Sequence, residues 1–129
     1  MDLSLPAGDF PASVKLIQGD QNDQAFLRRL GEEQGAFDIV IDDGSHFTRE
    51  TRTCFNTLWP FVAIDGWYVV EDWAVGYWKN SEARYRGMVE LVAEIMNDAP
   101  SHRIIQFQIS LKPGQAYAAF RKGTHGWQA

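Results

Sequence analysis

Hydrophobic and polar positions along the chain follow two periodicities. Short apolar runs typical of strands occupy residues 14–20, 37–42 and 66–72, and two more flank a Pro-Gly turn at 102–111 and 116–123. Between them, apolar residues recur every three to four positions over about 22–33, 48–62 and 84–97, as in helices with one buried face. The predicted order is therefore β-α-β-α-β-α-β-β.

This order predicts an α/β fold. Strands that alternate with helices form a mostly parallel sheet with right-handed crossovers and helices on both faces, and the closing hairpin adds an antiparallel edge. The segment FDIVID (37–42) is almost continuously apolar, as expected of a strand covered on both sheet faces. Residues 1–13 hold two prolines and no clear period, which predicts an irregular arm before a domain at 14–123 and a tail at 124–129.

Composition narrows the class of protein. With 129 residues, of which 45% are hydrophobic, the chain is long and apolar enough for one packed domain. The net charge of -5, without a run of Lys or Arg, argues against nucleic acid or an anionic membrane as a partner. A single cysteine, Cys54, fits a reducing compartment, and no segment has the pattern of a signal peptide or a membrane span. We expect a cytoplasmic protein.

Acidic residues follow three predicted strands at their carboxyl ends, where parallel sheets bind ligands: Asp20, Asp42, Asp43, Glu71 and Asp72. Converging carboxylates repel one another unless a cation lies among them, and oxygen ligands suit Mg²⁺, Ca²⁺ or Mn²⁺. His46, three residues after Asp43, is a suitable general base near neutral pH. We therefore expect His46 to deprotonate a hydroxyl held at such an ion.

Each residue also has a simpler interpretation. Asp42 alone is as often the cap of the following helix, and a lone histidine is more often a surface or helix-start residue. In the aromatic stretch after Asp72, Trp73, Tyr77 and Trp78 either pack beneath the third helix or form the wall of a substrate pocket. The combination of Asp-Asp-Gly-Ser-His after one strand and Glu-Asp after the next favours a functional site.

Four segments carry a resemblance to a known family. They are GDQND (19–23), FDIVIDDGSH (37–46), LWPFVAIDGWYVVEDW (58–73) and GYW (76–78). Over roughly 14–123 the chain resembles class I S-adenosylmethionine-dependent methyltransferases. It is most similar to the metal-dependent O-methyltransferases that modify sugar hydroxyls of macrolides and related natural products.

The resemblance implies a role for each candidate residue. Asp43 and Asp72 correspond to the acids that bind Mg²⁺ or another divalent cation, with Glu71 as a further candidate, and His46 corresponds to the catalytic base. Asp20 and Gln21 lie where the family contacts the adenosine part of S-adenosylmethionine, and Asp42 lies near the same pocket. The implied reaction passes a methyl group from the sulfonium to a hydroxyl of a sugar or natural product.

The resemblance is to a truncated Rossmann-like sheet. The family's first strand with its Gly-rich cofactor loop, and the second strand with its terminal acid, have no counterpart in these residues. Without them the apolar strand 37–42 keeps an open hydrogen-bonding edge, which proteins avoid. We expect residues 14–20 to pair with that edge, or a homodimer or partner chain to cover it.

Two other functions stay open at this point. One is a non-catalytic methyltransferase-like remnant that binds a metal or small ligand and oligomerises. The other is a metal-dependent enzyme that uses the same acids and His46 to activate water.

Overall fold

The computed structural model describes residues 5–79 and 82–125. Its elements are α1 (Gln24–Gln34), β1 (Phe37–Asp42), α2 (Thr48–Leu58), the 3₁₀ turn η1 (Trp59–Phe61), β2 (Val62–Glu71), α3 (Val75–Trp78), α4 (Met88–Asn97), α5 (Ala99–His102), β3 (Ile104–Ser110) and β4 (Tyr117–Lys122). None of the helices among these residues is long and apolar enough to cross a membrane.

The four described strands form one mixed sheet in the order β1-β2-β4-β3. β1 and β2 are parallel, whereas β4 runs antiparallel to both β2 and β3. The predicted α/β class and the closing hairpin are confirmed. Strands β1, β2 and β3 run in the same direction and only β4 is reversed, so the predicted mostly parallel sheet is confirmed as well.

The predicted strand at residues 14–20 is wrong, because this segment forms no strand in the structure. This segment is irregular, and the side chains of Val14, Leu16 and Ile17 are 45%, 38% and 37% exposed. A β-rich composition yields a strand only where a partner strand supplies hydrogen bonds and packing. The segment does not pair with β1, so within the described residues β1 is an edge strand.

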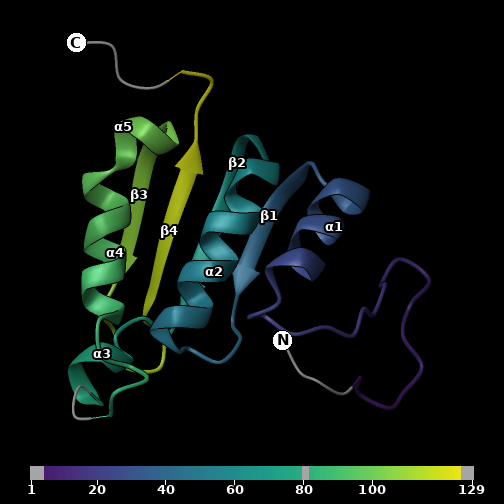
Figure 1. Cartoon of the computed structure of the whole chain (residues 1–129), viewed down its shortest axis with the longest axis horizontal. Helices are drawn as coiled ribbons and strands as arrows, with labels where there is room; N and C mark the ends of the chain where they lie inside the picture. Colours follow the sequence, from purple (N-terminus) through teal and green to yellow (C-terminus); the bar gives the residue numbers. More distant parts are fainter. Residues whose placement is uncertain (1–4, 80–81, 126–129) are drawn as a thin grey trace.

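Helices α1, α2 and α4 lie together on one face of the sheet (Figure 1). On this face Phe55 of α2 packs its ring against Tyr68 of β2 and Phe120 of β4, with centroids 5.1 and 6.0 Å apart. The prediction of helices on both faces is wrong for a topological reason. Both crossovers, from β1 through α2 to β2 and from β2 through α4 to β3, proceed in the same direction across the sheet, so right-handedness places both helices on the same side.

The opposite face of β1 is consequently exposed. Ile39 and Ile41 are 59% and 60% accessible, so the expectation that FDIVID is covered on both faces is also wrong. The predicted Pro-Gly turn is confirmed, because Gly114 turns the hairpin with a φ of 72°. Asp23 caps α1 by accepting a hydrogen bond from Phe26 N at 2.9 Å.

Candidate functional site

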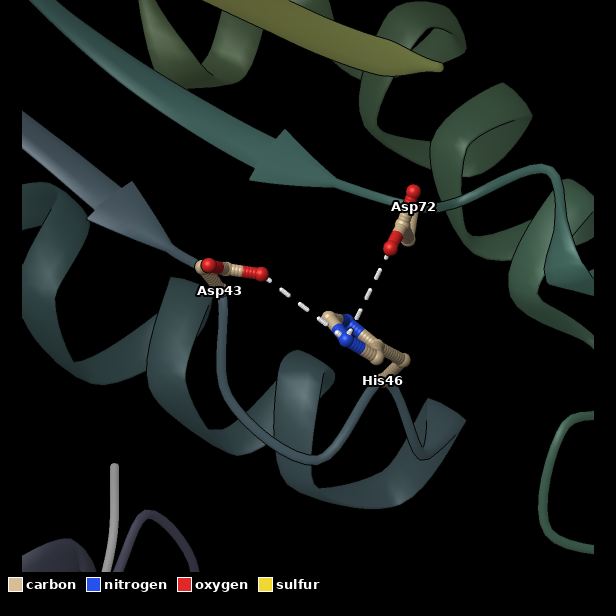
Figure 2. Close-up of side chains that lie close together, drawn as sticks. All are labelled: Asp43, His46 and Asp72. Carbon is tan, nitrogen blue, oxygen red and sulfur yellow. Dashed lines mark ion pairs between the residues drawn. The ribbon is translucent and has the colours of Figure 1, made fainter. Parts of the chain in front are cut away.

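Three chemically active side chains meet beyond the carboxyl ends of β1 and β2 (Figure 2). Nε2 of His46 lies 3.8 Å from Oδ1 of Asp43 and 3.9 Å from Oδ2 of Asp72. One ligand atom from each of the three residues lies within 4.8 Å of the others. The structure thus brings together the two predicted metal ligands and the predicted base.

The parallel pairing of β1 with β2 explains this convergence. Asp42 is in register with Val70, so the residues that follow the two strands leave the same edge of the sheet. His46 and Asp72 then adopt left-handed backbone conformations, with φ of 57° and 50°. Such conformations cost free energy for residues other than glycine and persist where the surrounding structure enforces them. At Asp72 the enforcing contact includes a hydrogen bond from its N–H to Ala116 O at 2.8 Å.

The geometry of the three side chains suits a divalent cation. Around an ion with metal–oxygen distances near 2.1 Å, ligand atoms are roughly 3 Å apart when adjacent and about 4 Å apart when opposite. One carboxylate oxygen of Asp43 and one of Asp72 lie within 4.8 Å of each other, so a small movement of either side chain brings both oxygens onto one hard cation. The side chains of Asp43 and Asp72 are 61% and 47% exposed, which leaves them free to move inward onto an ion.

Gln21 and Asp42 form a buried network behind this cluster. Gln21 Nε2 donates to Asp42 Oδ1 at 2.5 Å, and the Tyr68 hydroxyl donates to Asp42 Oδ2 at 3.1 Å. Gln21 Oε1 accepts hydrogen bonds from the backbone N–H and the hydroxyl of Ser45, both at 3.0 Å. Both Asp42 oxygens therefore have protein partners, and the network fixes the loop between Asp43 and His46.

Burial also sets the protonation behaviour of this network. Desolvation raises the pKa of the Asp42 carboxyl, although the hydrogen bond from Tyr68 acts in the opposite direction. Burial and the neighbouring Asp42 raise the pKa of the Cys54 thiol to about 12, so Cys54 is a neutral core residue. Sequence reasoning missed Tyr68, although a tyrosine within an apolar strand needs a buried partner for its hydroxyl.

The remaining predicted residues lie apart from the cluster. Asp20 is exposed and accepts a hydrogen bond from Asn22 N at 2.8 Å, closing the turn before α1. Of the aromatic residues after Asp72, Trp73 is buried and donates a hydrogen bond from Nε1 to Ser110 O at 3.2 Å. Trp73 therefore packs in the core and does not form the wall of a substrate pocket. Tyr77 and Trp78 are 56% and 58% exposed.

A cavity of about 240 Å³ follows the open edge of β1. Leu30 of α1, Val40 of β1 and Leu58 of α2 line its apolar part, and Gln21 and Asp42 line its polar end. The groove lies between the free strand edge and the helices beside it, where a further strand would pack.

No protein-family model matches the chain. Over 65 residues, half of the chain, it is 52% identical to the mycinamicin VI 2''-O-methyltransferase of Micromonospora griseorubida. Over 91 residues, 66% of the chain, it is 44% identical to the 8-demethyl-8-(2-methoxy-alpha-L-rhamnosyl)-tetracenomycin-C 3'-O-methyltransferase of Streptomyces olivaceus. The chain is a relative of sugar O-methyltransferases. The resemblance inferred from its motifs is thereby confirmed.

Solved structures agree with this relationship. The MycE methyltransferase from the mycinamycin biosynthetic pathway, in complex with Mg, SAH and mycinamycin VI, superposes with a TM-score of 0.68 at 35% identity. The match covers 83% of this chain but 31% of the MycE chain, and the aligned segments make up 16% and 23% of the two O-methyltransferase sequences above. This relative of the sugar O-methyltransferases spans about a third or less of the length of the proteins that it matches.

Proposed function

We propose that this chain forms the metal-binding and proton-accepting part of an S-adenosylmethionine-dependent O-methyltransferase that acts on a hydroxyl of a sugar-bearing natural product. The observation that carries the proposal is the convergence of Asp43, His46 and Asp72 in a chain related to such enzymes. The complex of MycE with Mg, SAH and mycinamycin VI supports the choice of both cofactors.

The three residues of the cluster have two proposed roles, metal binding and proton acceptance. Asp43 and Asp72 are the proposed ligands of Mg²⁺ or another divalent ion, because they present exposed carboxylates from neighbouring strands. When bound, the ion lowers the pKa of an adjacent hydroxyl, and S-adenosylmethionine supplies the methyl group. His46 is the proposed base, since its Nε2 lies beside both carboxylates and accepts the proton that the hydroxyl releases.

We propose different roles for the three residues assigned to the cofactor. Asp20 is exposed at the turn before α1 and is free to contact S-adenosylmethionine directly. Gln21 and Asp42 are buried and bonded to each other, so their proposed role is to hold the loop at Ser45 in the shape that the cofactor requires.

Calorimetric titration of the 129-residue chain with MgCl₂ tests the metal assignment. Asp43→Asn and Asp72→Asn each remove a charged ligand, so the affinity for Mg²⁺ should fall at least about tenfold. Asp38→Asn, an exposed acid on β1 outside the cluster, is the matched control and should leave the affinity unchanged. Full affinity in both cluster variants would contradict the metal site.

A second titration, with S-adenosylmethionine in the presence of Mg²⁺, separates the transferase from its main alternative. Saturable binding supports the transferase. Binding of Mg²⁺ without any binding of S-adenosylmethionine favours a non-catalytic, methyltransferase-like domain that holds a metal or small ligand and oligomerises.

The open edge of β1 is the observation that favours an assembly. We propose that a second copy of this chain, or a partner chain, covers this edge and the adjoining groove, because an apolar strand with unpaired backbone groups is otherwise exposed. We further propose that residues 14–123 form one domain. We also propose a cytoplasmic location, which the single, buried Cys54 supports.

A further inference from the structure

Residues 82–87 form a turn-rich segment between α3 and α4 that packs against the residues directly after His46. We refer to this segment as the strap. The N–H of Thr48 donates to Arg84 O at 3.0 Å, and the Thr48 hydroxyl donates to Arg86 O at 2.9 Å. Two hydrogen bonds therefore attach the first residue of α2 to the strap.

Aromatic side chains reinforce this attachment. Phe47, the residue after His46, meets Tyr85 of the strap edge to face, with ring centroids 5.4 Å apart. The guanidinium of Arg84 lies 5.1 Å from the ring centroid of Phe47 and 5.5 Å from that of Tyr85. Arg84 also forms an ion pair with Glu82 at 3.0 Å. Aromatic and cation–π contacts of this kind favour one relative placement of the two segments.

The imidazole of His46 depends on its backbone for its position. Its Nε2 lies 3.8 and 3.9 Å from the carboxylate oxygens of Asp43 and Asp72, which is beyond hydrogen-bonding distance. The backbone itself has a left-handed φ of 57°, which costs free energy unless neighbouring contacts enforce it. Gln21 holds the turn before His46 by accepting two hydrogen bonds from Ser45. The strap supplies contacts after it.

The core in turn fixes the strap. Trp73, where the chain leaves β2, is buried, and Met88, the first residue of α4, is fully buried. Gly87 turns the chain into α4 with a φ of 93°, and a Cβ at this position would lie 3.4 Å from the methyl group of Thr48. Because Met88 directly follows the strap, a displacement of the strap would disturb the close-packed core. The excursion that begins next to Asp72 thus ends firmly against Thr48.

We propose that the strap positions His46 for proton transfer, with Thr48 and Tyr85 as positioning residues. The inference rests on the proposed function and adds what fixes the base relative to Asp43 and Asp72. Thr48 and Tyr85 act through the backbone that follows His46, where their contacts lie. A displacement of the base by about 1 Å is enough to slow proton transfer strongly, since the base must lie within hydrogen-bonding reach of the hydroxyl.

NMR of the metal-free, 129-residue chain tests this role, because nuclear Overhauser contacts report how close the His46 ring lies to its neighbours. The ring resonances of His46 are assigned with the His46→Gln variant. In the wild type we expect contacts from the ring protons to the β-protons of Asp43 and Asp72, since the three side chains face one another (Figure 2). A purely structural role for the strap would lower stability and leave these contacts unchanged.

The variants come in matched pairs. Thr48→Val removes the hydroxyl donor and Tyr85→Leu removes the aromatic ring, so both variants should lose the contacts of the His46 ring. Thr48→Ser keeps the donor and Tyr85→Phe keeps the ring, so both should retain the contacts. Thr53→Val is the control, because it removes a hydrogen bond of the same kind, at 3.1 Å, farther along α2. Dispersed amide spectra establish that each variant is folded.

The outcomes separate this inference from the proposed function. Loss of the ring contacts in Thr48→Val and Tyr85→Leu, with retention in Thr48→Ser, Tyr85→Phe and Thr53→Val, supports the positioning role. Contacts that persist in both folded variants, that are lost equally in Thr53→Val, or that are absent from the wild type overturn it. Where one of the two variants does not fold, the other decides. The measurement uses no ligand, so failure of Mg²⁺ and S-adenosylmethionine to bind counts against the proposed function alone.

Discussion

At the scale of single residues, the site depends on two backbone conformations that sequence patterns do not reveal. His46 and Asp72 both have positive φ, and these conformations accompany side chains that face Asp43 and each other (Figure 2). Asp43 and Asp72 were predictable as neighbours, because each follows a strand of a parallel pair. The contact of His46 with both carboxylates also required the turn at residues 44–47 to close, which depends on Gln21 from a distant part of the chain.

Asp42 provides a test of the buried network at this scale. Burial raises the pKa of its carboxyl above the ordinary value of 3.8, so the folded state binds more protons than the unfolded state between these two pKa values. The free energy of unfolding contributed by Asp42 therefore falls as the pH rises from below 3.8 through the raised pKa. Asp42→Asn cannot titrate, so the wild type should lose stability relative to this variant over that range.

Urea unfolding at several pH values between about 3.5 and neutrality measures the difference. Asp38→Asn is the control, since Asp38 is exposed on the same strand. At neutral pH, Asp42→Ala should cost about 3 kcal/mol because it leaves the Gln21 amide and the Tyr68 hydroxyl without their buried acceptor. Parallel pH profiles for the wild type and Asp42→Asn would show that Asp42 does not titrate as proposed.

At the scale of elements, periodicity located every described helix of more than one turn and every described strand. Residues 14–20 were predicted to form a strand and do not. A strand is stabilised by a neighbouring strand, and this segment has no such neighbour among the described residues. The end of α2 shows the same dependence on context. Helical periodicity suggested a helix to about Val62, but α2 ends at Leu58 and β2 already begins at Val62.

Lys122 of β4 stabilises this transition between α2 and β2. Its Nζ donates to the carbonyl oxygens of Trp59, Pro60 and Val62 at 3.0, 3.0 and 2.8 Å, at the point where the helical segment ends. Lys122→Met keeps the length of the side chain but removes the donor, so the free energy of unfolding should fall by about 2 kcal/mol.

Chemical denaturation measures this loss. Lys112→Met, at an exposed lysine in the hairpin turn, should change stability by less than about 0.5 kcal/mol. Equal effects of the two substitutions would mean that the three hydrogen bonds of Lys122 contribute nothing beyond an ordinary surface charge.

At the scale of the whole molecule, the described elements leave the β1 edge and one face of the sheet uncovered. β1 has the composition of a strand inside a sheet but lies at its edge, with Ile39 and Ile41 exposed and a groove beside it. Exposed apolar edge strands favour pairing with another chain.

We therefore expect the isolated chain to dimerise through β1. Ile41→Lys places a charge on the exposed face of this strand and should convert the dimer to a monomer in light scattering coupled to gel filtration. Leu111→Lys is the control, because Leu111 is similarly exposed, at 53%, but lies beyond the end of β3. A wild-type chain that elutes only as a monomer would remove the proposal.

The sequence by itself determined the fold class, the resemblance to O-methyltransferases and the identity of the acidic residues at the sheet edge. These follow from periodicity and local motifs, which depend on neighbours a few residues away. Only the tertiary structure decided which strands pair, that the helices cover one face, and that Gln21, Asp42 and Tyr68 form one network. Those features depend on contacts between residues far apart in the chain, and the free energy of such contacts is not encoded in any single segment.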